Sequence, residues 1–307
     1  MFRSGTDRRR APPPRYHLRM NLTLLIDTAT LAAHLGDPGC IVFDCRHDLA
    51  DPGAGENEYA LGHIPGARFL HLDRDLSGLK NGSNGRHPLP DPEKFAGTLA
   101  RAGVGPQTQV VAYDAQGGMN AARLWWLLRW TGHGHAAVLD GGWKAWTAES
   151  RPQTVLVPDA APAQLRPVLR PIALSAPEVR AALGRQPLLD ARTAERYRGR
   201  SETLDPVGGR IPGAMNRFFM HNLDDSGRFK SAGALRRELG AVLGDTSPSE
   251  VVHYCGSGVS ACHNILAMEI AGLSGSRLYP GSWSEWCADP SRPTAQDEPQ
   301  PDEAIRP

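Results

Sequence analysis

One cysteine, Cys255, lies between a short apolar run and a helical pattern, in the segment VVHYCGSGVSACHNILAMEIAGL. The residues that follow it carry little side-chain bulk: Gly256, Ser257, Gly258, Val259 and Ser260. Backbone N–H groups of such a turn can converge on the cysteine sulfur, and the N-terminal end of a helix adds positive potential there. Because these surroundings lower the pKa of a thiol below its free value of about 8.5, Cys255 is predicted to be a nucleophile at neutral pH.

The other cysteines lack such surroundings. We interpret Cys40, Cys45 and Cys287 as core residues, because an isolated cysteine is more often buried than catalytic. Cys262 lies two helical turns into the predicted helix, which makes it either a core residue or a redox partner of Cys255. A total of five cysteines is low and odd, which argues against a disulfide framework. It indicates a reducing compartment, and we expect a cytoplasmic protein.

The chain contains an internal duplication. Four landmarks recur in the same order at offsets of about 140 to 147 residues: CIVFDCR and PLLDAR, HIPGA and RIPGA, VVAYDAQGG and VVHYCGSGV, and DGGWKAW and PGSWSEW. A repeat of this length predicts two tandem domains. Alignment of the third pair places Asp114 opposite Cys255. The first domain is therefore predicted to keep the fold without the nucleophile.

Apolar runs alternate with helical patterns, such as the one that begins at Leu24, in both halves of the chain. This alternation predicts an α/β fold of two tandem domains, each a mostly parallel sheet flanked by helices on both faces. Ligands of such sheets bind beyond the carboxyl ends of the strands, which is where Cys255 follows VVHY. The predicted organisation is an N-terminal extension (1–20), a first domain (21–150), a linker rich in Pro and Ala (151–172), a catalytic domain (173–290) and a flexible tail (291–307). We expect the extension to be disordered, or to reflect an over-long gene start before Met20.

Composition narrows the range of partners. The formal net charge of +1 gives no reason to expect nucleic acid, and no apolar run approaches the roughly 20 residues of a membrane span. His133 and His135 lack further ligands at metal-binding spacing, so we predict neither a metal site nor a cofactor. We expect a monomer or a weak dimer.

The tandem layout, the HIPGA and RIPGA segments, the GGW and GSW motifs and the loop CGSGVSA resemble rhodanese-type sulfurtransferases. The loop is most similar to the CGSGVTA pattern of 3-mercaptopyruvate sulfurtransferases, from which it differs at Ser260, and the likeness covers about residues 21–293. The resemblance implies two rhodanese domains, of which the first is inactive, and a persulfide on Cys255. Sulfur would pass from a small anionic donor to cyanide, a small thiol or thioredoxin. The resemblance and the loop's small size together imply that the donor is held by Gly256, Gly258, Val259 and Ser260.

The resemblance also implies roles for residues outside the loop. It assigns donor binding to Arg196, with Arg192 nearby at the strand end. It assigns a proton relay to Ser257 together with His87 and Asp73 of the first domain, by the logic of other Ser-His-Asp sets.

The preferred donor rests on charge. The loop contains no charged residue, whereas thiosulfate-preferring enzymes have patterns such as CRKGVTA, so a monoanionic keto acid fits better than a dianion. Mercaptopyruvate enzymes carry a second arginine nine residues after the first, and Asp205 stands there in this chain, which weakens the preference. Arg198, Arg200 or Arg210 are candidates for the missing charge. We predict 3-mercaptopyruvate as the donor, with thiosulfate as the alternative.

Two other classes of protein are alternatives for a chain with such a cysteine. A cysteine phosphatase requires the pattern C-x5-R, because its arginine binds phosphate, and the sixth residue after Cys255 is Ala261. A non-enzymatic module for sulfur relay or protein interaction is the other alternative, and the presence of Cys255 argues against it.

Overall fold

The first half of the chain forms a five-stranded parallel sheet in the computed structural model, which describes residues 22–297. The strand order is β1-β5-β4-β2-β3, with the bounds β1 Leu25–Ile26, β2 Cys40–Asp44, β3 Arg68–Phe69, β4 Gln109–Tyr113 and β5 Ala136–Leu139. Its helices are α1 Thr28–Ala33, α2 Ala54–Leu61, α3 Pro92–Arg101, α4 Met119–Trp130 and α5 Gly142–Ala148. The prediction that a helix begins at Leu24 is wrong about where that helix starts. The pair Leu25–Ile26 extends beside β5 first, and α1 begins only after its cap Asp27.

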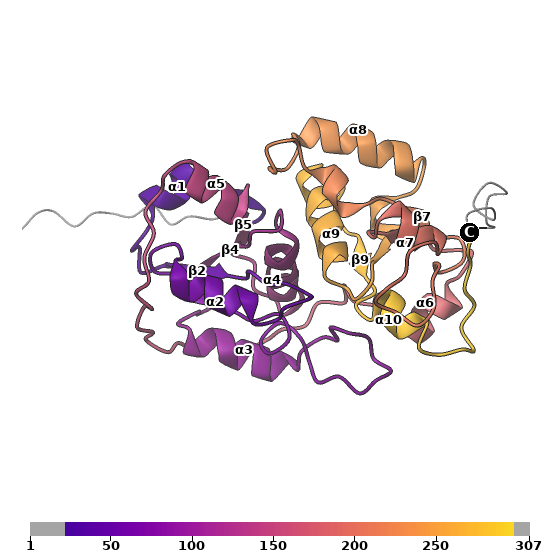
Figure 1. Cartoon of the computed structure of the whole chain (residues 1–307), viewed down its shortest axis with the longest axis horizontal. Coiled ribbons are helices and arrows are strands. Elements are labelled where there is room, and N and C mark those ends of the chain that lie inside the picture. Colours follow the sequence, from indigo (N-terminus) through magenta and orange to yellow (C-terminus); the bar gives the residue numbers. More distant parts are fainter. Residues whose placement is uncertain (1–21, 298–307) are drawn as a thin grey trace, which may run out of the picture.

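The second half forms a four-stranded parallel sheet with the order β7-β6-β8-β9. Its strands are β6 Leu188–Asp190, β7 Met215–Asn216, β8 Val252–Tyr254 and β9 Arg277–Leu278. Its helices are α6 Ala176–Ala181, α7 Ala194–Arg198, α8 Ala232–Leu243, α9 Ser260–Ile270 and α10 Ser282–Trp286, with 3-10 turns at Phe219–Asn222 and Pro248–Glu250. The two domains lie side by side (Figure 1). The predicted fold class is confirmed.

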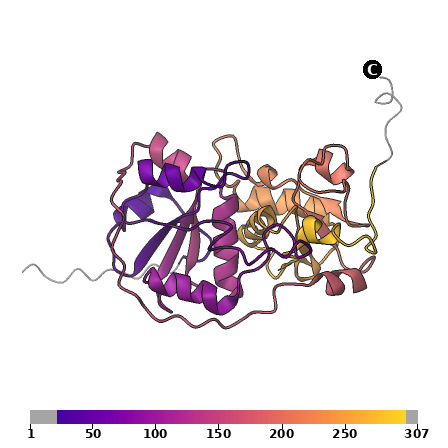
Figure 2. The same ribbon diagram turned by 60° about the horizontal axis from the view of Figure 1, so that its bottom comes forward.

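Successive residues of a strand point to opposite faces of the sheet. Because apolar side chains point to both faces of the first sheet, helices cover both faces. Val42 and Val111 pack in a cluster with residues of α1 and α5, whereas Ile41 and Val110 pack with α3 and α4. Figure 2 shows this sheet between its two helical layers. A strand buried on both faces reads as an unbroken apolar run, which is how these strands appear in the sequence. Within the described part of the chain, no helix combines the length and apolar character that a membrane crossing requires.

One of the hydrophobic clusters spans both domains. Helices α4 and α9 face each other between the sheets (Figure 1), and their buried side chains, including Leu124 and Leu266, belong to a single cluster. The His263 Nε2 atom of α9 lies 3.0 Å from the carbonyl oxygen of Gly117, in the loop before α4. Since α4 follows β4 and α9 follows β8, the loops at the carboxyl ends of both central strands meet at this interface.

The segment between the domains runs in extended form along the first domain and then crosses to the second (Figure 2). Backbone hydrogen bonds fix it, such as the one from the Val168 N–H to the Thr131 carbonyl at 2.9 Å. Beyond α10, residues 291–297 pack on the second domain, where Trp286 Nε1 donates to the Pro293 carbonyl at 2.8 Å. The start of the expected flexible tail is thus held by contacts. The rest of that tail, at 298–307, and the expected extension at 1–20 lie outside the described residues.

Candidate active site

Cys255 lies at the carboxyl end of β8, directly before the loop that leads into α9. The residue is 2% exposed, and its Sγ atom accepts a hydrogen bond from the Gly258 N–H at 3.1 Å. Gly258 has a φ of +78°, and a Cβ at this position would collide with the carbonyl of Pro280, so the loop requires glycine there. One of the predicted backbone donors to the sulfur is therefore in place.

The segment after β9 holds the Cys255 loop from the other side. Ser282 Oγ accepts from the backbone N–H of Cys255 at 3.1 Å and donates to the Tyr279 carbonyl at 3.0 Å. The backbone N–H of Ser284 donates to the Gly256 carbonyl at 2.9 Å. Ser282 adopts a left-handed φ of +55°, a conformation that residues other than glycine rarely take. Its side-chain bond to the Cys255 N–H offsets this cost.

The predicted relay residues form a chain that leads away from the loop. Ser257 Oγ lies 2.7 Å from His87 Nδ1, and His87 Nε2 lies 3.6 Å from Asp73 Oδ1. Burial, and then repulsion by Arg123, lower the pKa of His87 to about 3, so its ring is neutral at physiological pH. Burial alone would raise the pKa of Asp73, but its hydrogen bond from Lys80 and nearby positive charge lower it overall. The Asp73 charge favours a proton on Nε2, which leaves Nδ1 to accept the Ser257 hydroxyl hydrogen.

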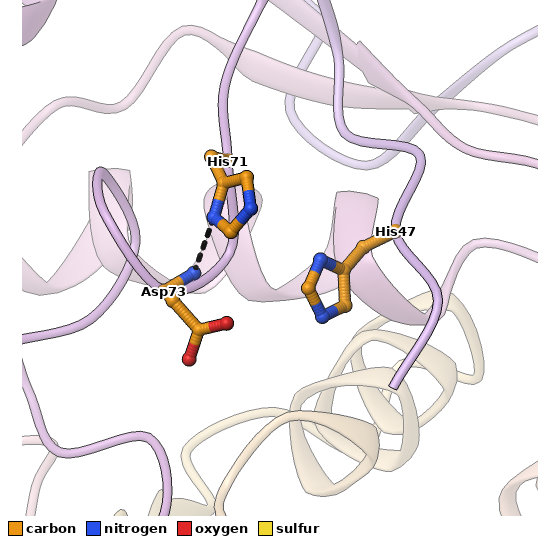
Figure 3. A group of neighbouring side chains, drawn as sticks. All are labelled: His47, His71 and Asp73. Carbon is orange, nitrogen blue, oxygen red and sulfur yellow. Dashed lines mark hydrogen bonds between the residues drawn. The ribbon is translucent and has the colours of Figure 1, made fainter. Parts of the chain in front are cut away.

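A group of potential metal ligands lies beside this chain. His47, His71 and Asp73 place one ligand atom each within 4.8 Å of one another (Figure 3). Both ring nitrogens of His71 are engaged, since Nδ1 accepts from the Asp73 backbone N–H and Nε2 donates to the Pro52 carbonyl, each at 3.0 Å. These bonds fix the turn that carries Asp73 and leave His71 no nitrogen for a metal ion. We interpret the group as structural support for the relay.

Arg192 lines the site, but its guanidinium group is tied to the fold. Its Nη2 atom pairs with Asp190 at 2.6 Å, and both side chains are buried. The first domain repeats this arrangement with Arg46 and Asp44, also at 2.6 Å. Because the pair recurs in the domain without a nucleophile, the geometry favours a structural role. The predicted donor contact of Arg192 stays a prediction.

Arg196 of α7 is the other predicted donor-binding residue. It pairs with Glu202 at 2.8 Å and with one oxygen of Asp205 at 3.3 Å. The second oxygen of Asp205 pairs with Arg86, which comes from the first domain. Sequence reasoning missed Arg86, although it directly precedes the predicted relay residue His87 in GRHPLP.

The two arginines and the nucleophile line a pocket of about 180 Å³ at the junction of the domains. The first domain contributes Leu49, Leu72, Arg86, His87 and Met119. Of the predicted loop residues, the pocket is lined by Cys255, Gly256, Ser257, Val259 and Ser260. Gly258 lies beneath the sulfur, and Asp73 lies behind His87. Two candidates for the missing charge, Arg198 and Arg210, pair instead with Asp297, at 3.6 and 2.8 Å, and are not among the lining residues.

The loop after β4 has the same length as the Cys255 loop and contains its own anion. Helix α4 begins five residues after Asp114, as α9 begins five residues after Cys255. The buried Asp114 carboxylate accepts hydrogen bonds of 2.7 to 2.9 Å from the backbone N–H groups of Gln116, Gly118, Asn120 and Ala121. Burial raises the pKa of Asp114, although these four bonds oppose the shift. Backbone N–H groups of this loop therefore bind a carboxyl group in the first domain. The two loops differ directly before the helix, where Gly118 has a φ of +93° and Val259 a φ of −93°.

Two side chains behind the Cys255 loop hold the Gly258 carbonyl. Arg123 of α4 is fully buried and donates to this oxygen at 3.1 Å and to the His87 carbonyl at 3.1 Å. Cys262 Sγ donates to the same Gly258 oxygen at 3.3 Å. Burial raises the pKa of Cys262 to about 12, which favours a core residue over a redox partner. Arg123 thus connects the loop and the relay segment, a role that its place in an apolar helix did not reveal.

These features define a class of protein: a tandem α/β protein in which one cysteine, at the end of a central strand, faces a pocket shared by both domains. The profile of the rhodanese-like domain matches residues 27–149 and 175–289, so the chain belongs to the rhodanese-like family. The expected family is confirmed.

Relatives of this chain carry two activity names. It is 44% identical over 284 residues to a Pseudomonas aeruginosa protein named "Probable 3-mercaptopyruvate sulfurtransferase", with 90% of this chain and 99% of the relative covered. It is 34% identical to the thiosulfate sulfurtransferase of Gallus gallus, with 85% of this chain and 90% of the relative covered. The solved 3-mercaptopyruvate sulfurtransferase from Leishmania major superposes on this chain with a TM-score of 0.77 at 29% sequence identity. The superposition covers 86% of this chain and 74% of the Leishmania major chain.

Proposed function

We propose that this chain is a sulfurtransferase that moves sulfur from 3-mercaptopyruvate to a thiophilic acceptor through a persulfide on Cys255. The observation that carries the proposal is the position of the Cys255 sulfur. It lies at the start of a loop, and the loop at the equivalent position of the first domain binds the Asp114 carboxylate through four backbone N–H groups. A persulfide, like a carboxylate, carries a negative charge that needs hydrogen-bond donors. Preorganised backbone N–H groups stabilise such a charge. Sulfurtransferase relatives of both names support the same chemistry.

In the first step the Cys255 thiolate attacks the thiol sulfur of the donor. A sulfur–sulfur bond forms, the carbon–sulfur bond breaks, and its electron pair passes to the enolate of pyruvate. The proton of the donor thiol must leave the sulfur and return to the enolate carbon. Ser257 and His87, which are 2.7 Å apart beside the loop, are suited to carry it, with Asp73 holding the tautomer of the ring.

In the second step an acceptor removes the outer sulfur. With cyanide, the carbon attacks that sulfur, thiocyanate leaves, and the Cys255 thiolate is restored. A small thiol or thioredoxin takes the sulfur in the same way and releases a persulfide. Cytoplasmic thiols of this kind suit a chain whose cysteines are all free. The protein is proposed to work in that compartment.

Thiosulfate is the second candidate donor, and the observation in its favour is the presence of two arginines at the pocket, Arg86 and Arg196. Their charges are matched by the carboxylates of Asp205 and Glu202, so the pocket has little net positive field for a dianion. Thiosulfate also needs no proton relay, because its sulfite leaving group departs without a new bond to carbon. The Ser257–His87 contact therefore favours 3-mercaptopyruvate.

The substitution Ser257→Ala tests the relay and the donor together. It removes the hydroxyl next to His87 and keeps the loop backbone. We expect kcat/KM with 3-mercaptopyruvate to fall by about 100-fold, the scale of general acid–base catalysis, and kcat/KM with thiosulfate to change less than about threefold. Cyanide is the acceptor in both assays, and thiocyanate is measured.

Thiosulfate turnover by the same variant is the control for an intact nucleophile. Equal losses with the two donors would remove the relay from the mechanism. Wild-type protein that uses thiosulfate much better than 3-mercaptopyruvate would reverse the order of donors.

A further inference from the structure

We infer that Arg86 of the first domain is a donor-binding residue, and that Arg86 and Arg196 together clamp the anionic group of the donor above Gly256. The inference deepens the proposed function, on which it rests only for the identity of the donor. Binding of a small carboxylate beside Cys255 does not itself require sulfur transfer.

The two guanidinium groups converge on one point of the loop. A Cβ at Gly256 would lie 2.6 Å from Arg86 Nη2 and 3.4 Å from Arg196 Nη1. Neither of these nitrogen atoms has a hydrogen-bond partner among residues 22–297. Both arginines line the pocket that contains Cys255, the residue directly before Gly256. Two unpaired, cationic N–H groups thus face the same space beside the nucleophile.

The rest of each guanidinium group is held in place. Arg86 Nη1 pairs with one oxygen of Asp205, and Arg196 Nη2 lies 3.3 Å from the other. The Asp205 side chain is 3% exposed, so the carboxylate that joins the two arginines is buried. A carboxylate that holds two guanidinium groups in one geometry lowers the entropic cost of binding a ligand between them.

The main chain of Arg86 is anchored to the catalytic loop as well. Its backbone N–H donates to Ser284 Oγ at 3.0 Å, and the backbone N–H of Ser284 donates to the Gly256 carbonyl at 2.9 Å. Gly85 adopts a φ of +84°, and a Cβ there would lie 2.8 Å from the Gly281 carbonyl, so glycine permits this close approach. The first domain therefore delivers Arg86 to a fixed place beside the loop.

The charges around the clamp define its ligand. Asp205 and Glu202 balance Arg86 and Arg196, so the clamp binds through two directed donors and not through a net positive field. A carboxylate presents two oxygens to such a pair, as in bidentate recognition by arginine. The ligand class is a small monoanionic carboxylate that carries sulfur within reach of Cys255.

Alkylation of Cys255 by two reagents of similar size tests the clamp without any sulfur transfer. Iodoacetate carries a carboxylate and iodoacetamide does not, so the ratio of their rates with Cys255 measures carboxylate binding next to the sulfur. We expect Arg86→Gln to lower this ratio by about tenfold, through loss of one charged hydrogen bond, and to leave the iodoacetamide rate nearly unchanged. Arg86→Lys keeps the charge without the fork of donors and should give an intermediate ratio.

Arg198→Gln is the matched control, because Arg198 pairs with Glu195 and Asp297 and lies outside the pocket lining. It should keep the wild-type ratio. An unchanged ratio in Arg86→Gln would overturn the inference, as would an equal drop in Arg198→Gln.

Steady-state assays then separate the clamp from the proposed function. Arg86→Gln should raise the KM for 3-mercaptopyruvate by about tenfold with a smaller effect on kcat, since the clamp binds the part of the donor that does not react. A wild-type protein that transfers no sulfur, but whose alkylation ratio still depends on Arg86, would refute the proposed function and keep the clamp. A normal KM in a variant with a reduced kcat would count against the clamp.

Discussion

Asp114 and Cys255 show how one side chain decides the use of a loop. The Asp114 carboxylate reaches into its own loop and accepts four backbone hydrogen bonds. Cys255 has a shorter side chain with one sulfur, which among residues 22–297 accepts a single hydrogen bond, from the Gly258 N–H. The first loop is therefore closed by its own residue. The second leaves N–H groups for an atom that is added to the sulfur.

Ser282 positions the Cys255 loop, and two substitutions can separate the stabilising effect of its hydrogen bond from the cost of its left-handed backbone. Ser282→Ala removes the hydrogen bond to the buried Cys255 N–H and keeps a side chain at a φ of +55°. Leaving that N–H unpaired should destabilise the protein by about 1–3 kcal/mol. Ser282→Gly loses the same bond but relieves the left-handed backbone, so its loss should be smaller by roughly 1 kcal/mol. Urea unfolding of both variants measures the difference, and equal losses would contradict the strain.

At this scale the sequence predicted the residues that lie in one continuous motif and missed those that depend on distant contacts. Cys255 and its neighbours were predicted because a turn of small residues before a helix has a direct chemical meaning. The contact of His87 with Ser257, 170 residues apart in the chain, was expected only through the family resemblance. Arg86 is placed by a bond to Ser284, 198 residues away, which no local pattern encodes.

Among the elements, α4 and α9 organise the site because each starts at the loop of a central strand and each packs on the other. Both are buried on nearly every side, so they lack the one-sided apolar pattern of a surface helix. Sequence could therefore predict that they are buried helices, but not that they face each other. The repeated motifs predicted equivalent loops, and the packing of α4 on α9 brings these loops together.

The strands show where local prediction fails at small scale. The runs at β2, β4 and β8 were expected because strands buried on both faces are apolar throughout. The two-residue strand β1 was missed, since a pair such as Leu25–Ile26 has no periodicity and is extended only because β5 pairs with it. The preference of a short segment is overridden by its partner.

The whole molecule builds one site from two domains. The second domain supplies the nucleophile, and the first, whose equivalent loop is closed by Asp114, supplies Arg86 and His87 to the pocket. Arg123 of the first domain also fixes the Gly258 carbonyl. The duplication predicted an inactive first domain. The contacts give that domain a reason to be present in the active protein.

Buried histidines should make the stability of the whole fold depend on pH. Burial lowers the pKa of His253 to about 3 and that of His263 to about 4. Between these values and the unfolded value of about 6.5, the unfolded chain binds more protons than the folded one. The contribution of these histidines to the free energy of unfolding is therefore fully present above about pH 6.5. It falls as the pH decreases, by about 1.4 kcal/mol per pH unit for each such histidine.

The substitution His253→Asn removes one of these groups, so the slope of stability below about pH 6 should be shallower than that of wild type by about 1.4 kcal/mol per pH unit. Above about pH 7 the two stability curves should run parallel, because the wild-type histidine is neutral in both folded and unfolded chains. Urea unfolding across this range measures both slopes. Parallel curves over the whole pH range would show that His253 does not contribute to the loss of stability at low pH.

The central claim is that sulfur is carried on Cys255, and mass spectrometry of the protein after treatment with 3-mercaptopyruvate tests it most directly. Without an acceptor, the peptide that contains Cys255 should gain one sulfur atom, and cyanide should remove it. Cys255→Ser protein should gain none, because a hydroxyl group cannot form a persulfide. Continued turnover in that variant, or the added sulfur on another cysteine such as Cys262, would contradict the account.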